Sequence, residues 1–303
     1  MITKQVRIVE VGPRDGLQNE AQIISLADKV KLIESLAQAG IQHIEAGSFV
    51  SPKWVPQMAD SLEVMQEIKR LDNVRYSALV PNSKGLEQAI KANASEIAIF
   101  SAASESFCQK NINCSIAESL SRFEDIMTIA KAQGLAVRGY VSCILGCPYE
   151  GDITKENASS HFEKVKAVCV KLLELGCYEI SLGDTIGTGT PKYTEQLLKV
   201  LLEDIPANKL AVHFHDTYGQ ALANILIALQ NGISTIDSSI SGLGGCPYAK
   251  GASGNVATED VVYMLKGMGI ETGIDLKQLI AIGNDISEQL NRPNGSKVGK
   301  ALE

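Results

Sequence analysis

The fold is decided by the stretch EISLGDTIGTGTPKYTEQLLKVLLEDIPANKLAVHFHD, residues 179–216. Two short runs, Glu179–Gly183 and Leu210–Asp216, have the pattern of strands, and Thr194–Glu203 between them has a helical pattern. Both runs are largely continuous in apolar character, as is typical of parallel strands covered on both faces. The stretch therefore predicts a strand–helix–strand unit of a parallel sheet.

The same unit occurs eight times along the chain. The predicted strands are Val6–Val11, His43–Gly47, Val74–Leu79, Glu96–Phe100, Val137–Val141, Glu179–Gly183, Leu210–Asp216 and Thr235–Ser241. The predicted helices are Leu26–Gln38, Ser61–Lys69, Lys84–Ala92, Ile116–Gln133, Lys155–Leu175, Thr194–Glu203, Gln220–Gln230 and Glu259–Lys266. Eight such units indicate an α/β fold of the TIM (β/α)8 barrel type.

A doubly wound sheet is the alternative, but it usually carries a glycine-rich phosphate loop after its first strand. Here that position holds Gly12-Pro-Arg-Asp-Gly16, which we expect to form a loop. A further helical pattern begins near Leu276. We therefore expect a catalytic barrel domain over residues 1–275 and a C-terminal helix and tail, 276–303, packed on or near the barrel.

Composition narrows the class of protein. The chain has 303 residues, a net charge of −7 and seven cysteines, an odd number that argues against a disulfide framework. The acidic balance argues against nucleic acid as a partner, and no apolar run is long enough to span a membrane. The first residues enter a strand pattern at once, without the features of a targeting segment. From these features we expect a cytoplasmic protein.

Two of the four histidines, His213 and His215, lie two residues apart in one predicted strand. Residues i and i+2 of a strand point to the same face, so both imidazoles would converge on one point. Such a pair suits a divalent metal, whereas a lone buried histidine is more often a core residue that hydrogen bonds to the backbone. The pair favours a metal site at a strand end, where TIM barrels carry their active sites.

Charged side chains follow or lie within the first two strands. Asp15 beside the two histidines would complete a metal site of two imidazoles and one carboxylate. Arg14 could then stabilise a developing enolate oxygen, although Arg14 and Asp15 alone could form a solvated turn. Glu45 lies inside the second strand, where a carboxylate is costly unless it is paired, so we expect Arg14 as its partner.

Three further polar residues lie at the later strand ends. Asp184 ends the sixth strand, and we expect it to support the site, for example by orienting a histidine. Cys246 lies on a glycine-rich loop after the eighth strand, where its thiol could transfer a proton as the loop closes. Asn255 could cap the following helix or ligate a metal, and its spacing favours neither.

Taken together, these motifs resemble the 3-hydroxy-3-methylglutaryl-CoA (HMG-CoA) lyase family. The matching segments are VGPRDGLQNE (11–20), IEAGSFVSPKWVPQMAD (44–60), GYVSC (139–143), DTIG (184–187), HFHD (213–216) and GLGGCPY (242–248). Arg-Asp-Gly and His-x-His occur in a wider superfamily of metal-dependent barrels, whereas the Gly-Cys-Pro loop is specific to the lyases. The resemblance extends, in order, over nearly the whole chain.

The resemblance implies cleavage of HMG-CoA to acetyl-CoA and acetoacetate, as in leucine degradation and ketone-body formation. It implies Mg²⁺ or Mn²⁺ bound by Asp15, His213, His215 and Asn255, with a small-molecule acyl-CoA as substrate. Arg14 would hold the thioester oxygen and Cys246 would transfer a proton, with Glu45 and Asp184 as supporting catalytic groups.

Several points stay open at this stage. Asp15, His213 or a bound water could take the hydroxyl proton, and a homodimer is the oligomeric state to test. The alternatives are a condensing enzyme of the isopropylmalate or homocitrate synthase type, a hydroxy-oxo-acid aldolase, and a metal-binding barrel without turnover.

Overall fold

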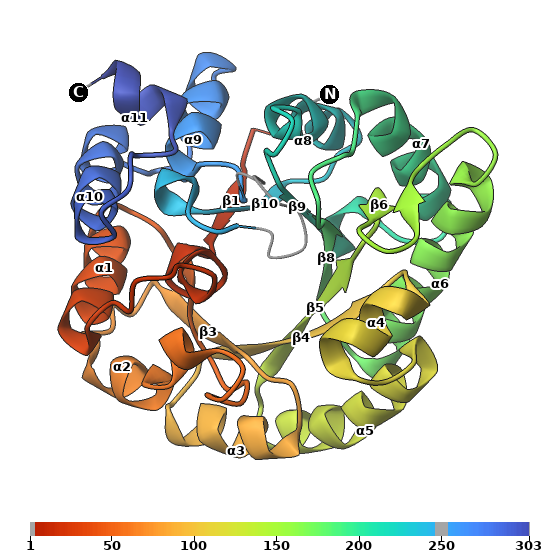
Figure 1. Ribbon diagram of the computed structural model, residues 1–303, viewed down its shortest axis with the longest axis horizontal. Coiled ribbons are helices and arrows are strands. Elements are labelled where there is room, and N and C mark those ends of the chain that lie inside the picture. Colours follow the sequence, from red (N-terminus) through yellow and green to blue (C-terminus); the bar gives the residue numbers. More distant parts are fainter. Residues whose placement is uncertain (1–3, 246–253, 303) are drawn as a thin grey trace.

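The computed structural model of the protein describes residues 4–245 and 254–302, which form a closed barrel of eight parallel strands (Figure 1). Around the barrel the strand order is β1-β10-β9-β8-β5-β4-β3-β2. The strands are β1 (Arg7–Glu10), β2 (His43–Ser48), β3 (Arg75–Leu79), β4 (Glu96–Ala102), β5 (Ala136–Ser142), β8 (Glu179–Asp184), β9 (Leu210–Phe214) and β10 (Thr235–Ser238). The predicted TIM barrel is confirmed.

Helices surround the barrel and bury its outer face (Figure 1). They are α1 (Leu26–Gln38), α2 (Ser61–Glu67), α3 (Ser83–Lys91), α4 (Glu105–Ile112), α5 (Ile116–Ala132), α6 (Ala158–Leu175), α7 (Pro191–Leu201), α8 (Ala221–Gln230), α9 (Thr258–Gly267), α10 (Leu276–Gln289) and α11 (Lys297–Ala301). Local sequence signals determine where several of these helices begin. At α5, for example, Ser115 and Glu118 form a capping box that satisfies two backbone N–H groups.

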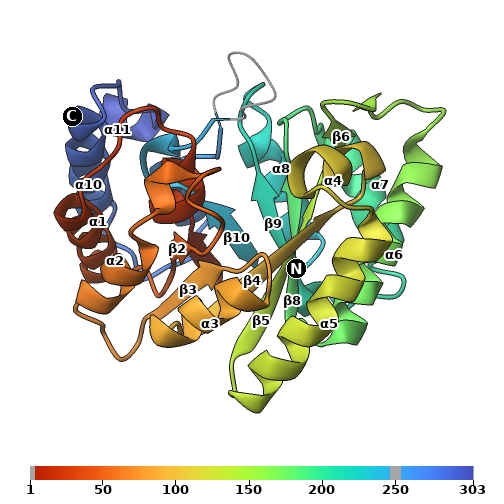
Figure 2. The same ribbon diagram turned by 60° about the horizontal axis from the view of Figure 1, so that its bottom comes forward.

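The structure adds two elements that the strand–helix alternation did not predict. Helix α4 lies between β4 and α5, and a short antiparallel hairpin, β6 (Gly146–Cys147) with β7 (Gly151–Asp152), follows β5 (Figure 2). Both are too short to give a clear hydrophobic period. The eighth strand also ends at Ser238 rather than at Ser241, because Ile240–Gly242 forms a 3-10 turn.

The expected loop after β1 is instead one turn of π-helix, Gly12–Gly16. Both glycines are required by close packing. A Cβ on Gly12 would lie 2.6 Å from Oε1 of Glu10, and a Cβ on Gly16 would lie 2.7 Å from Oγ of Ser239. The same Glu10 oxygen accepts the backbone N–H groups of Gly12 and Ile240, both at 2.8 Å. The turn is therefore anchored from within the barrel.

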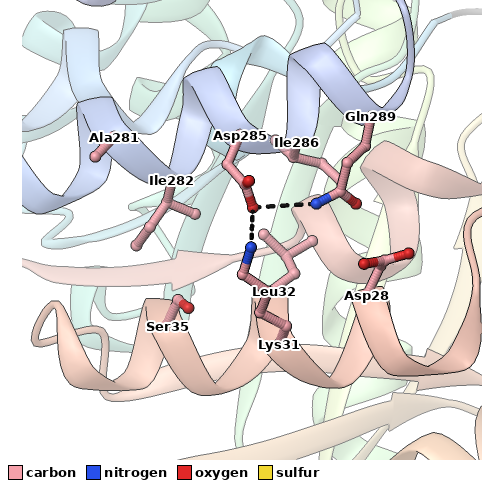
Figure 3. Close-up of a pocket in the computed structure, with 9 residues that line it drawn as sticks. All are labelled: Asp28, Lys31, Leu32, Ser35, Ala281, Ile282, Asp285, Ile286 and Gln289. Atoms are coloured by element: carbon pink, nitrogen blue, oxygen red, sulfur yellow. Dashed lines mark hydrogen bonds and ion pairs between the residues drawn. The ribbon is translucent and has the colours of Figure 1, made fainter.

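The predicted C-terminal helical region is present as α10 and α11. Helix α10 lies beside α1, and a groove of about 200 Å³ runs between them (Figure 3). There Asp285 accepts hydrogen bonds from Lys31 at 2.8 Å and from Gln289 at 3.1 Å. In the described part of the chain, no helix is both long enough and apolar enough to cross a membrane.

Candidate active site

Two histidines meet at the C-terminal end of β9. His213 lies within the strand and His215 one residue beyond it, so both rings point to the same side and their centroids lie 5.5 Å apart. Both residues are buried, with 8% and 9% of their surface exposed. The predicted convergence of the two imidazoles is confirmed.

The π-helical turn brings Asp15 to this pair. Oδ2 of Asp15 lies 3.7 Å from Nε2 of His213, and one ligand atom from each of Asp15, His213 and His215 fits within 4.8 Å of the others. The Nδ1 of His215 is buried and has no hydrogen-bond partner among the described residues. One carboxylate and two imidazoles, one of which has an unpartnered buried nitrogen, fit a divalent cation.

The side chain of Asn255 joins the same cluster. Its Nδ2 donates to Oδ2 of Asp15 at 2.8 Å and to the carbonyl of Leu243 at 3.2 Å. The N-cap of α9 is Ala257, so Asn255 does not cap that helix. Of the two roles left open by the sequence, the cap is excluded, and the amide lies against the Asp15 carboxylate.

The charges of the cluster act on one another. Burial disfavours ionised Asp15, but the positive charge of Arg14 and the two histidines outweigh it and lower the pKa of Asp15 to about 2. Burial and the neighbouring His213 lower the pKa of His215 to about 4, which keeps this imidazole neutral at physiological pH. Asp15 is therefore anionic and His215 neutral, the protonation states that metal ligands need.

Arg14 lies between Asp15 and the carboxylate of Glu45 on β2. Its Nε donates to Oε2 of Glu45 at 2.6 Å and its Nη1 donates to Oδ1 of Asp15 at 2.7 Å. The predicted pairing of Glu45 with Arg14 is confirmed. Burial nevertheless raises the pKa of Glu45 more than Arg14 lowers it. The Arg14 guanidinium also lies 5.8 Å from the ring centre of Tyr140.

Asp184 is held by the loop that follows its own strand. Its Oδ2 accepts the backbone N–H of Gly189 at 2.9 Å, and its Oδ1 is buried with no partner among the described residues. Burial raises the pKa of Asp184 to about 7. Among the described residues, the carboxylate that contacts Nδ1 of His213 is a different one, Asp237. Cys246 lies outside the described residues.

Sequence reasoning missed Asp237 and Tyr140. Asp237 lies in β10, where one of its oxygens is 3.3 Å from Nδ1 of His213. The Tyr140 ring stands edge-on to His213, with centroids 5.9 Å apart. Asp237 could have been found by the argument applied to Glu45, because it too is a carboxylate inside a barrel strand. Tyr140 gave no such signal, because an aromatic residue in a strand is ordinary.

A comparison with known protein families identifies the family of the chain. Residues 5–286, nearly the whole chain, match the family model described as HMGL-like. The chain belongs to the HMGL-like family. The lyase resemblance of the sequence motifs is thereby confirmed, and with it the expectation of a carbon–carbon lyase.

Relatives of this HMGL-like chain carry one activity in their names. The mitochondrial hydroxymethylglutaryl-CoA lyase of Bos taurus is 59% identical over 98% of this chain and 90% of its own length. A crystal structure of hydroxymethylglutaryl-CoA lyase from Pseudomonas aeruginosa superimposes with a TM-score of 0.95 at 53% identity, covering 99% of this chain and 98% of that one. An HMG-CoA lyase structure from Acinetobacter baumannii, in complex with coenzyme A and 3-methylmalate, has a TM-score of 0.91 at 36% identity, covering 98% and 95%.

One expectation is wrong. The sequence features predicted a cytoplasmic protein, but the bovine, macaque, rat and chicken relatives in the HMGL-like family are all named mitochondrial. Charge, cysteine count and the strand pattern near the N-terminus describe the folded enzyme. A barrel with the same site can work in either compartment, so these features do not identify one.

Proposed function

We propose that this site cleaves HMG-CoA to acetyl-CoA and acetoacetate, with Mg²⁺ or Mn²⁺ held by Asp15, His213, His215 and Asn255. The observation that carries the proposal is the convergence of Asp15 and the two histidines within 4.8 Å at the C-terminal end of the barrel. The names of the relatives indicate which substrate to propose. A divalent cation, when bound, lowers the cost of deprotonating the substrate hydroxyl and neutralises its free carboxylate.

Cleavage breaks the bond between C2 and C3 of the substrate. The C3 hydroxyl loses a proton and becomes the ketone of acetoacetate, while the bonding electrons move to C2 and form the enolate of the thioester. Arg14 is suited to hold the enolate oxygen, because its guanidinium is buried, charged and fixed by Glu45 and Asp15. A donor fixed before the reaction has no reorganisation cost when the negative charge develops.

Two proton transfers complete the reaction. We assign Asp184 as the acceptor of the hydroxyl proton, because burial raises its pKa to about 7 and its Oδ1 has no partner among the described residues. Asp15, with a pKa lowered to about 2, is a much weaker base. C2 of the enolate then takes up a proton, for which we assign the thiol of Cys246, a residue that follows β10 in the sequence.

The test is release of acetyl-CoA from a panel of 3-hydroxyacyl-CoA thioesters in the presence of Mg²⁺. HMG-CoA should give acetyl-CoA and acetoacetate in equal amounts, and thioesters without the second carboxylate should react far more slowly. Condensation of acetyl-CoA with a 2-oxo acid, without cleavage of HMG-CoA, would instead favour a synthase. No turnover of any thioester, with metal bound, would favour a binding protein.

A further inference from the structure

A buried arginine joins three strands of the barrel. Arg138, on β5, has 2% of its surface exposed and donates to Glu179 on β8, to Asp237 on β10 and to the hydroxyl of Tyr140 on its own strand. Its Nε donates to Oε2 of Glu179 at 2.9 Å. Its Nη2 and Nη1 donate to the two oxygens of Asp237, at 2.7 Å and 3.0 Å. A buried charge of this kind is costly, and the bidentate fork offsets the cost by fixing Asp237 in one orientation.

Asp237 can act only as an acceptor in this setting. Its Oδ2 receives hydrogen bonds from Nη1 of Arg138 and from Oγ of Ser181, the latter at 2.7 Å. Both of its oxygens accept from the buried Arg138 guanidinium, a charge-assisted pairing that favours the ionised carboxylate. An ionised carboxylate has no proton to donate, so whatever else contacts Oδ2 must be a donor.

The remaining contact of Oδ2 is the imidazole of His213. Asp237 and His213 are paired in register on the neighbouring strands β10 and β9, and Oδ2 lies 3.3 Å from Nδ1. The proton of a neutral His213 is therefore placed on Nδ1. The lone pair is then left on Nε2, the nitrogen that lies 3.7 Å from Asp15.

We propose that Asp237, held by Arg138, is a positioning residue that fixes the Nδ1–H tautomer of His213 and so prepares Nε2 as a ligand nitrogen. The inference rests on the proposed metal site, but not on the reaction carried out there. A carboxylate that accepts from the far nitrogen of a ligand histidine fixes the ring and raises its affinity for the metal. Because Arg138 holds Asp237, the contact between Asp237 and His213 belongs to the barrel interior and not to a loop.

The tautomer can be read in the wild-type protein without metal or substrate. The chain has four histidines, so labelling the imidazoles with ¹⁵N gives a small set of signals. His43→Gln and His161→Gln variants identify the two rings outside the site. At alkaline pH, where the His213 ring is neutral, we expect a protonated Nδ1 and an unprotonated Nε2. A neutral His213 protonated on Nε2 would overturn the proposal.

Metal affinity tests the consequence, measured by calorimetric titration of the metal-free protein with Mn²⁺. Asp237→Asn should bind Mn²⁺ about 10- to 100-fold more weakly than wild type, and Asp237→Glu should recover part of the loss because it restores the charge and the acceptor. Glu96→Gln is the matched control. It removes another buried barrel carboxylate, one that contacts Arg75, and should leave Mn²⁺ affinity unchanged.

The possible results distinguish a failure of this proposal from a failure of the proposed function. Unchanged Mn²⁺ affinity in Asp237→Asn, or an equal loss in Glu96→Gln, would overturn it. If no Asp237 variant folds, the tautomer of His213 in the wild-type protein is sufficient to confirm or overturn the proposal. Failure of the proposed function is a separate result, because the tautomer and the Mn²⁺ affinity would then be as expected while HMG-CoA remained uncleaved.

Discussion

At the residue scale, the site depends on two neighbours in sequence with different partners. Arg14 and Asp15 occupy one π-helical turn, which sends the arginine toward Glu45 and the aspartate toward the histidines. The ion pair between Arg14 and Asp15 holds both in place. The charge proposed to stabilise the enolate and the charge proposed to bind the metal are therefore fixed by the same five residues.

Arg14→Lys should lower kcat far more than it raises KM. Lysine keeps the charge but loses the planar fork that holds Glu45 and Asp15, so its ammonium is not fixed where the enolate oxygen develops. Loss of one such fixed donor commonly costs on the order of 10²-fold in kcat. Steady-state kinetics with HMG-CoA provide the measurement. A variant changed only in KM would show that Arg14 merely anchors the substrate.

His213→Ala should fold yet bind Mn²⁺ much more weakly, because it removes one of three converging ligands. Titration of the metal-free variant with Mn²⁺ measures the loss directly. His161→Ala is a suitable control, since that ring contacts the backbone carbonyl of Cys143 instead. Wild-type Mn²⁺ affinity in His213→Ala would exclude His213 as a ligand.

Cys246→Ala should fold and bind metal normally but lose roughly 10²- to 10⁴-fold in kcat, the usual contribution of one proton-transfer group. An alkylating agent should also inactivate the wild-type enzyme, and a bound substrate analogue should protect it. The rate of inactivation with and without analogue checks this. A fully active Cys246→Ala protein would remove the thiol from the mechanism.

At the element scale, buried carboxylates fasten the turns above the barrel. Glu10 holds the π-helical turn, and both oxygens of Glu259, on α9, accept the backbone N–H of Ser241, at 3.0 and 2.9 Å. The strands and the helix periods could be predicted because they depend on local apolar patterns. The π-helical turn, α4 and the β6–β7 hairpin could not, because each depends on contacts between residues distant in sequence or on runs too short for a period.

The contribution of two buried glutamates, Glu10 and Glu259, to the stability of the fold should fall as the pH rises from about 5 to 8. Burial raises the pKa of Glu259 to about 8 and that of Glu10 to about 7, so the folded state binds these protons more tightly than the unfolded state. Their stabilising contribution is complete below a pH of about 4.5 and is lost as the pH rises through the folded values.

Glu259→Gln should therefore flatten the dependence of Tm on pH and leave a smaller slope, to which Glu10 and Asp184 contribute. The difference at pH 8 should be on the order of a few kcal/mol in the free energy of unfolding. Thermal unfolding at pH 5, 6, 7 and 8 measures the slope. Glu124→Gln, an exposed change on α5, is the control. Equal slopes in Glu259→Gln and wild type would contradict the assignment.

At the scale of the whole molecule, the barrel brings charged side chains from distant parts of the chain together. The site residues come from the ends of β1, β8 and β9, from within β2 and from the segment before α9, so closure of the sheet is what brings Asp15 within reach of residues about 200 positions away. The sequence indicated these strand ends because the fold predicts where polar residues converge. It did not indicate that Arg138 pairs with Asp237, because nothing local shows which interior charges pair across a barrel.

The central claim is that cleavage of HMG-CoA requires the divalent cation bound by Asp15 and the two histidines. The most direct measurement is the rate of acetoacetate formation from HMG-CoA by protein stripped with EDTA, before and after Mg²⁺ or Mn²⁺ is returned. We predict that stripping abolishes the activity and that either ion restores it in wild type, while Asp15→Asn stays nearly inactive at the same ion concentration. Full activity in the stripped protein would contradict the account.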